Sequence, residues 1–310
     1  MTLHSIIFHV GCPKAASTSI QSSLTKHRSL LLDQGYFYPL SSYEKHPEFA
    51  LLSSFDIFDS YRTYINFIPK SFDSNANIRD FFESRISAYI RDFNNSNCHT
   101  LILSDEILPY YCNTIEKLNC LKSLFPFETD IHFIYYIRPP ADMYISLYST
   151  LVKVDQTNLW PHHFHLPSSL NQSSNWICSP EMFDHSSFIF NIQTVFGSNS
   201  LSVFHYHDIL QSPQFASPVD HFFGFIGITP AYRVACKSNP RLDFPSLFIL
   251  CLFNRIARLF SSYSFPHSFL LIIRSKLLIP LLESFSSFSF LHFPSRRVLS
   301  QRREFNQLFS

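Results

Sequence analysis

The sequence is poor in charge and in glycine. Charged residues make up 15% of its 310 positions, the formal net charge is +1, and there are five glycines. A protein that binds nucleic acid generally needs a basic excess to neutralise phosphates, so this balance argues against that class of function. Because glycines are so few, each one is informative about where the backbone needs unusual freedom.

Cysteine pairs at the spacing of metal or redox motifs are also missing. The seven cysteines are scattered without a C-x-x-C pair, and a chain of this length does not need the dense disulfide framework of a small secreted domain. A strand-like run, Ser5–Val10, occupies the place where a secretory signal would carry a basic patch and an apolar stretch. Reduced thiols and a cytoplasmic location are therefore expected.

A long hydrophobic run is lacking as well. The most apolar stretch, Phe269–Leu282, has about 14 residues and is interrupted by Arg274, Lys276 and Pro280, whereas a membrane-spanning helix needs about 20. No transmembrane span is expected. We interpret this stretch as a buried helix, with attachment to a membrane surface as the less favoured alternative.

Strand and helix patterns do alternate along the chain, and a hydrophobic content of 46% suffices for a large buried core. Short apolar runs predict strands at 6–10, 100–103, 131–137 and 201–204. Apolar periodicity and helix-start signals predict helices at 17–33, 77–93, 138–152, 213–226, 245–263 and 267–282. This order is typical of an α/β fold, with a central parallel sheet flanked by helices and right-handed crossovers.

The first expected strand is followed by a loop that carries chemistry. In an open parallel sheet, ligands bind beyond the carboxyl ends of the strands, and here Gly11–Ala16 leads directly into a helix that starts at Ser17. A helix N-terminus attracts anions, and Lys14 adds a full positive charge. The alternative is an ordinary turn with a solvated lysine.

The same residues can be compared with the phosphate-binding loop motif of nucleotide triphosphatases and kinases. Its pattern, G-x-x-x-x-G-K-[ST], counted from Gly11, puts Ala16 where the second glycine belongs and Ser17 where the lysine belongs. The pattern fails at both positions. A metal-dependent nucleotide kinase or triphosphatase is therefore the less favoured function.

The run His9–Gln21 resembles the 5′-phosphosulfate-binding loop of the sulfotransferases, whose bacterial carbohydrate-type members carry a pattern close to H-I-G-x-P-K-T-G-S-T-S-L-Q. The match includes both flanks and departs at Ala15 and Ala16, where the family prefers Thr or Ser and then Gly. Alanine at position 16 is costly if that residue needs a positive φ, and harmless if the residue is already helical.

A second match concerns the 3′-phosphate. The family places an arginine at the end of a central strand and a serine eight residues later, and Arg138 and Ser146 have this spacing. A guanidinium offers permanently charged planar donors, and a hydroxyl two helical turns further on closes the other side of a phosphate. The alternative for Arg138 is an ion pair with Asp142 at the start of the helix.

The third match is the acidic end of the strand at 100–103. Bacterial members often follow this strand with S-x-E, and Ser104-Asp105-Glu106 fits. The resemblance implies that Glu106 is the base that activates the acceptor, because a partly buried carboxylate can take a proton from a hydroxyl group. Asp105 as the base, and a structural role for Glu106, stay open.

Taken over roughly residues 3–260, the resemblance implies a P-loop-like sulfotransferase that uses 3′-phosphoadenosine 5′-phosphosulfate (PAPS), releases 3′-phosphoadenosine 5′-phosphate (PAP) and acts on an acceptor hydroxyl, expected on a carbohydrate. Lys14 and Glu106 are the implied catalytic residues. The implied cofactor-binding residues are Gly11, Cys12, Pro13, Lys14, Ala15, Ala16, Ser17, Thr18, Ser19, Arg138 and Ser146. A relative that binds the nucleotide without catalysis is the second alternative.

We expect a single domain over 1–310, with the cofactor-binding core at about 3–152 and 196–260 and a helical part at 245–310. The aperiodic stretch 155–180 is expected to form an acceptor loop or lid. Its histidines, His162, His163 and His165, have no placed fourth ligand, so no metal site is expected.

Overall fold

The computed structural model describes residues 5–12, 15–41, 44–54, 75–153, 184–228, 244–261 and 273–288. Two compact units divide the chain. The first comprises Met1–Arg138 and Asp184–Lys237, and the second comprises Pro139–Phe183 and Ser238–Ser310.

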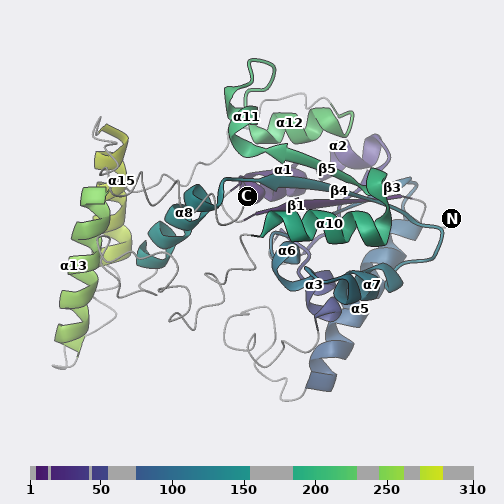
Figure 1. Cartoon of the computed structure of the whole chain (residues 1–310), viewed down its shortest axis with the longest axis horizontal. Helices are drawn as coiled ribbons and strands as arrows, with labels where there is room; N and C mark the ends of the chain where they lie inside the picture. Colours follow the sequence, from purple (N-terminus) through teal and green to yellow (C-terminus); the bar gives the residue numbers. More distant parts are fainter. Residues whose placement is uncertain are drawn as a thin grey trace. The chain divides into compact units, whose positions relative to one another are not determined.

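A five-stranded parallel sheet forms the centre of the first unit (Figure 1), in the order β2-β3-β1-β4-β5. Its strands are β1 Ser5–Gly11, β2 Tyr36–Phe37, β3 Thr100–Ser104, β4 Asp130–Ile137 and β5 Leu201–His205. The interior strands are nearly continuous apolar runs because helices cover both faces of the sheet. The predicted α/β class with a parallel sheet is confirmed.

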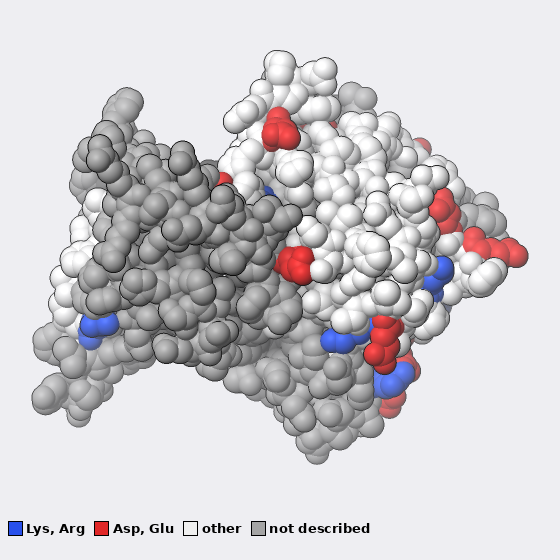
Figure 2. Space-filling view, viewed as in Figure 1, with Lys and Arg blue, Asp and Glu red and all other residues white. Residues whose placement is uncertain are grey.

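Helices cover the two faces of this sheet in two groups (Figure 1). One face carries α1 Ser17–Lys26, α2 Arg28–Asp33, α11 Tyr206–Gln211 and α12 Pro218–Phe225. The other carries α3 Glu48–Ser53, α5 Asn75–Asn95, α6 Leu108–Tyr111, α7 Ile115–Ser123 and α10 His185–Phe196. On the face shown in Figure 2, the described residues present few charged side chains.

Successive strands are added first on one side of β1 and then on the other, so the sheet has a topological switch point beside β1. From β1 the chain crosses to β2 at one edge, returns to β3 beside β1, and then passes to β4 and β5 on the other side. Ligands of open parallel sheets bind at such switch points. The loop after β1 therefore lies where the topology favours a binding site.

Most of the predicted elements are present, with some different bounds. The four predicted strands correspond to β1, β3, β4 and β5, while the two-residue β2 and the helices α3, α6, α7, α10 and α11 were not predicted. The single helix expected at 17–33 is interrupted at His27, which separates α1 from α2. The helix expected at 213–226 begins only at Pro218, because the Ser217 side chain caps its N-terminus by accepting from the Asp220 N–H.

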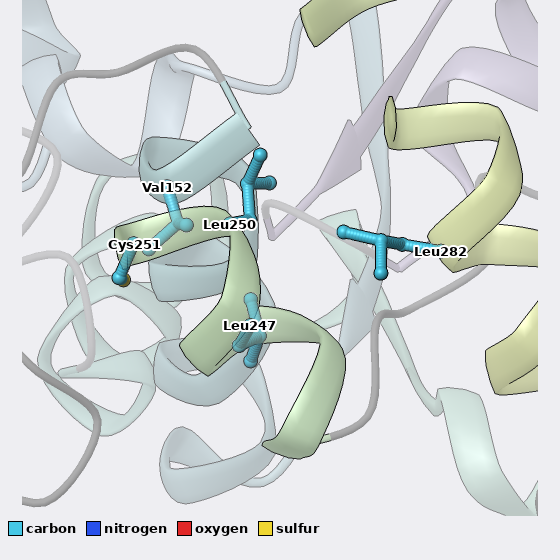
Figure 3. Close-up of a cluster of buried hydrophobic side chains, with 5 residues drawn as sticks. All are labelled: Val152, Leu247, Leu250, Cys251 and Leu282. Carbon is cyan, nitrogen blue, oxygen red and sulfur yellow. The ribbon is translucent and has the colours of Figure 1, made fainter. Parts of the chain in front are cut away.

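The second unit contains α8 Pro140–Lys153, α13 Phe244–Ser261, a π-helical segment Arg274–Leu278 and α15 Ile279–Phe288. They share a buried hydrophobic cluster (Figure 3), whose members are Val152, Leu247, Leu250, Cys251 and Leu282. Two polar contacts reinforce it: Asn254 Nδ2 donates to the Val152 carbonyl at 2.9 Å, and Lys153 Nζ lies 2.5 Å from Glu283 Oε1.

The prediction of a buried helix over 269–282 is wrong for the residues that the structure describes. Leu282 is buried in the cluster, but Leu277 and Leu281 are exposed, because only one side of this helical segment reaches α13. Within the described part of the chain, no helix is long and apolar enough to cross a membrane.

The predicted domain layout is only partly covered. Residues 139–153, expected in the core with the strands, belong to the second unit, and the single-domain assignment over 1–310 stays a prediction. The predicted acceptor loop at 155–180 lies outside the described residues, as do 289–310 of the helical part.

Candidate functional site

The three segments that the sequence predicts to form the site directly follow three neighbouring strands, β1, β3 and β4. β1 pairs with β3 on one side and with β4 on the other, with His9 opposite Ser104 and Gly11 opposite Tyr136. Because all three strands are parallel, their carboxyl ends meet at one edge of the sheet. The loop after Gly11, the acidic pair Asp105-Glu106 and Arg138 are thereby brought to the same edge of the first unit.

The loop after β1 turns sharply into α1. The Cys12 N–H donates to the Tyr136 carbonyl at 3.0 Å, and the Ala15 N–H donates to the Cys12 carbonyl at 3.1 Å. Ala16 follows with φ 67° and ψ 13°, and its carbonyl accepts from the first turn of α1. Pro13 and Lys14 lie outside the described residues.

The conformation of Ala16 answers the question that the sequence left open. The residue is in the left-handed region, which costs a residue with a Cβ about 1–2 kcal/mol relative to glycine. The departure from the family pattern at this position therefore introduces backbone strain beside the start of α1.

The N-terminus of α1 is suited to an anion. Its ten residues start at Ser17, no side-chain cap is formed by the described residues, and the first turn carries no acidic residue. The first N–H groups of a helix have no partner within the helix, and they lie at the positive end of its dipole. This end of α1 faces the loop after β1.

Gly11 is required by close packing against Ser17. A Cβ on Gly11 would lie 2.0 Å from Ser17 Oγ and 3.8 Å from His9 Nε2, so any larger residue would force the Ser17 side chain to move. Both of these polar atoms are buried and find no hydrogen-bond partner among the described residues. The inner side of the loop thus presents a hydroxyl and an imidazole nitrogen.

His9 also joins three elements through its other nitrogen. His9 Nδ1 lies 2.7 Å from Ser104 Oγ, which accepts from Gln21 Nε2 at 3.2 Å. Complete burial lowers the pKa of His9 to about 3, so the imidazole is neutral near pH 7. This contact fixes β1, β3 and α1 relative to one another; the sequence showed His9 in the motif but not its partners.

The two acidic residues after β3 have different surroundings. Asp105 is buried: its N–H donates to the His9 carbonyl and its Oδ1 accepts from the Ile107 N–H, both at 3.0 Å. Burial raises the pKa of Asp105 well above its usual value. Glu106 is partly exposed, with 26% of its side chain accessible, and its Oε1 accepts from Lys45 Nζ at 2.9 Å.

Lys45 is a site residue that the sequence did not reveal. Burial by itself lowers its pKa, but Glu106 and Asp105 together outweigh burial and raise the pKa of Lys45 overall. The next residue, His46, fixes this segment to β3: its N–H donates to the Ser104 carbonyl at 2.8 Å, and its Nδ1 accepts from the Ser104 N–H at 3.1 Å. Since 61 positions separate Lys45 from Glu106, no local pattern signals the contact.

Arg138 is held at the end of β4 by aromatic neighbours. Its guanidinium carbon lies 5.5 Å from the centroid of the Tyr206 ring, and its carbonyl accepts from His185 Nε2 at 3.2 Å. Burial lowers the pKa of His185 to about 4, so this ring is neutral and its Nδ1 accepts from the Tyr135 hydroxyl at 2.7 Å. Ser146 lies on α8 of the second unit, and its pairing with Arg138 as a phosphate site stays a prediction.

A cysteine nucleophile and a bound metal ion are two further sources of reactivity at such a site. Burial raises the pKa of the Cys12 thiol to about 12, so this cysteine is protonated and unsuited to act as a nucleophile at neutral pH. Among the described residues, no group of three or more His, Cys, Asp or Glu is placed to hold a metal ion, and the three histidines at 162–165 lie outside those residues.

Neither a family model nor a curated protein matches the sequence. Among solved structures, the chain is similar to the crystal structure of a sulfotransferase from Alicyclobacillus acidocaldarius. The sequence identity is 15%, the match covers 86% of this chain and 93% of that chain, and the TM-score is 0.47.

Proposed function

We propose that the protein is a sulfotransferase that moves the sulfuryl group of PAPS to an acceptor hydroxyl group on a carbohydrate. The observation that carries this proposal is the loop from Gly11 to Ser19. Its sequence resembles a phosphosulfate-binding loop, and it leads from β1, which lies between β3 and β4, to the N-terminus of α1, where the described residues form no side-chain cap.

The described part of this loop fits the 5′-phosphosulfate of the donor. Gly11 brings the backbone close to Ser17, and the N-terminus of α1 supplies N–H donors. Ser17 Oγ is a buried hydroxyl that finds no partner among the described residues, so it is available as a further donor to an anion. Lys14, whose position the sequence motif gives, would stabilise negative charge on the bridging and sulfuryl oxygens.

Arg138 would hold the 3′-phosphate together with Ser146. The Tyr206 ring packs against the guanidinium and restricts its orientation, which reduces the entropy lost on binding. A phosphate at this place would distinguish a 3′,5′-bisphosphate nucleotide from one with a 5′-phosphate alone.

The transfer itself needs one proton acceptor. In the proposed step, a bond forms between the acceptor oxygen and sulfur, the bond between sulfur and the bridging oxygen breaks, and the hydroxyl proton passes to Glu106. The neighbouring Lys45 ammonium donates to Glu106 Oε1 at 2.9 Å and would hold this carboxylate in place. PAPS supplies the activated sulfuryl group.

The conformation of Ala16 favours a second function, nucleotide binding without catalysis. The left-handed Ala16 strains the loop that would contact the donor, as expected for a relative that binds the nucleotide but does not catalyse transfer. A kinase or triphosphatase is less well supported, because Ala16 and Ser17 occupy the positions that its loop motif reserves for Gly and Lys.

Calorimetry and a transfer assay together test these functions. A sulfotransferase binds PAP far more tightly than AMP, loses about 2–5 kcal/mol of that affinity in Arg138→Ala, and transfers labelled sulfate from PAPS to carbohydrate acceptors. Binding of PAP without any transfer supports the silent relative. Equal affinities for PAP and AMP rule out both, and magnesium-dependent ATP binding supports the kinase.

A further inference from the structure

Helix α13 is apolar on two opposite sides. One side contributes Leu247, Leu250 and Cys251 to the buried cluster of the second unit (Figure 3). The opposite side exposes four large apolar side chains by 39–47% of their areas: Phe248, Ile249, Leu252 and Ile256. A helix that is hydrophobic all round normally has both sides covered, so the exposed side of α13 indicates contact with a partner.

The helical segment from Arg274 to Phe288 repeats this arrangement. It lies beside α13 (Figure 1) and packs against it through Leu282. Leu277 and Leu281, one helical turn apart, are 65% and 54% exposed. Two neighbouring helices therefore both expose leucines and other large apolar residues. We call the residues Phe248, Ile249, Leu252, Ile256, Leu277 and Leu281 the outer apolar surface.

Basic residues accompany this surface. Arg255 is exposed next to Ile256, and Lys276 is exposed next to Leu277. The acidic residue of these two helices, Glu283, is paired with Lys153 of α8. The described helices thus combine apolar exposure with positive charge.

Along the sequence, positive charge is concentrated in the C-terminal part that contains these helices. Residues 244–310 contain eight Lys and Arg against two Asp and Glu, a net charge of +6, whereas residues 1–243 contain 16 against 21, a net charge of −5. The near-neutral total therefore conceals a basic C-terminal part. Helices that expose apolar and basic residues together commonly bind anionic membrane surfaces.

We propose that the outer apolar surface binds the interface of a membrane containing anionic lipids. A symmetric contact between two copies of the chain is less well supported, because it would place two surfaces of the same positive sign against each other. Anionic lipid head groups instead complement the basic residues, while the apolar side chains enter the boundary between head groups and acyl chains. This inference goes beyond the proposed function and does not depend on it.

Flotation of the full-length protein with vesicles tests the proposal. The probes are vesicles of phosphatidylcholine with and without phosphatidylglycerol. Binding is expected to the anionic vesicles, to be weak with phosphatidylcholine alone, and to weaken with added salt. Absence of binding to the anionic vesicles overturns the proposal.

Variants then locate the contact. The double variant Leu277→Ser/Leu281→Ser should reduce vesicle binding at least about tenfold, and Lys276→Glu should reduce it about fivefold or more. Phe190→Ser on α10, which is also 65% exposed but lies in the first unit, is the matched control and should bind like the wild type. The circular dichroism spectrum and the melting temperature show that each variant is folded.

Two other results contradict the proposal. If Phe190→Ser weakens vesicle binding as much as the double variant, the contact is not at the outer apolar surface. If light scattering finds a dimer that the double variant dissociates, while vesicle binding is unchanged, this surface is an interface between copies. PAP binding and sulfate transfer are measured separately, so failure here leaves the proposed function standing.

Discussion

The Lys45 ammonium nitrogen lies 2.9 Å from Glu106 Oε1, and this contact links the segment before α3 to the end of β3. Both side chains are partly exposed, so the pair lies at the boundary between the core and solvent at the candidate site. The ammonium donates a charge-assisted hydrogen bond to the carboxylate and restricts its orientation.

Replacing Lys45 with methionine should lower the turnover of transfer about tenfold, because the Glu106 carboxylate loses the partner that holds it in place. Lys45→Arg retains a positive charge and hydrogen-bond donors, so it should keep most of the wild-type turnover. Turnover and PAP affinity are measured for both variants. Wild-type turnover in Lys45→Met would contradict a role of Lys45 in positioning Glu106.

Glu106→Gln tests the proposed base. Glutamine has nearly the same size but cannot take a proton, so turnover should fall about 10²- to 10⁴-fold while PAP affinity and the melting temperature change little. Asp105→Asn is the matched control, because Asp105 is buried and held by Ile107 and His9. If only the Asp105 variant loses turnover, the base is one residue earlier; if neither does, it lies elsewhere.

Ala16→Gly should stabilise the protein by about 0.5–1 kcal/mol, because glycine adopts the left-handed conformation without the Cβ clash. Ala15→Gly is the control: Ala15 is buried and is not among the described residues with positive φ, so the lost methyl group and the added freedom of the unfolded chain should both destabilise the protein. Urea unfolding measures both. Equal destabilisation by the two substitutions would contradict the strain at Ala16. A gain in turnover by Ala16→Gly would further support the loop as the donor site.

Buried histidines should make the protein less stable in mild acid. Burial lowers the pKa of His9 to about 3, and the pKa values of His46 and His185 to about 4, from an ordinary value of 6.5. The unfolded chain therefore binds more protons than the folded one below pH 6.5, so the stability due to each neutral histidine is lost as pH falls towards its folded pKa.

His9→Gln isolates one of these contributions. The difference between its free energy of unfolding and that of the wild type should shrink as pH falls from about 6 to 4, by up to about 1.4 kcal/mol per pH unit. His27→Gln, on a partly buried histidine between α1 and α2, is the control. A difference that stays constant over this pH range would show that His9 titrates normally.

The strands and the loop motif were readable in the sequence because their signals are local. A parallel strand covered on both faces must be apolar along its length, and Ser5–Gly11 and Asp130–Ile137 show this directly. The helix starting at Ser17, and the anion-type loop before it, likewise follow from neighbouring residues. The strand β2 and the short helix α6 give too few residues for a periodic signal.

The contacts of the candidate site, in contrast, join residues far apart in the sequence and have no local signal. Lys45 meets Glu106 across 61 positions, and His9 meets Ser104 across 95, so these pairs exist only because β1 and β3 are neighbours in the sheet. The left-handed φ of Ala16 is also imposed from outside, because alanine by itself prefers other conformations and the turn between Cys12 and α1 decides the backbone.

In the second unit, the sequence likewise does not predict which apolar side chains are buried. Leu247 and Phe248 are adjacent on α13 and both strongly apolar, yet Leu247 is in the buried cluster and Phe248 is exposed. The sequence by itself determined that this helix is apolar and that the C-terminal part is basic. Only the tertiary structure decided which side of the helix packs against α15, because burial depends on the neighbour that a side chain meets and not on its own hydrophobicity.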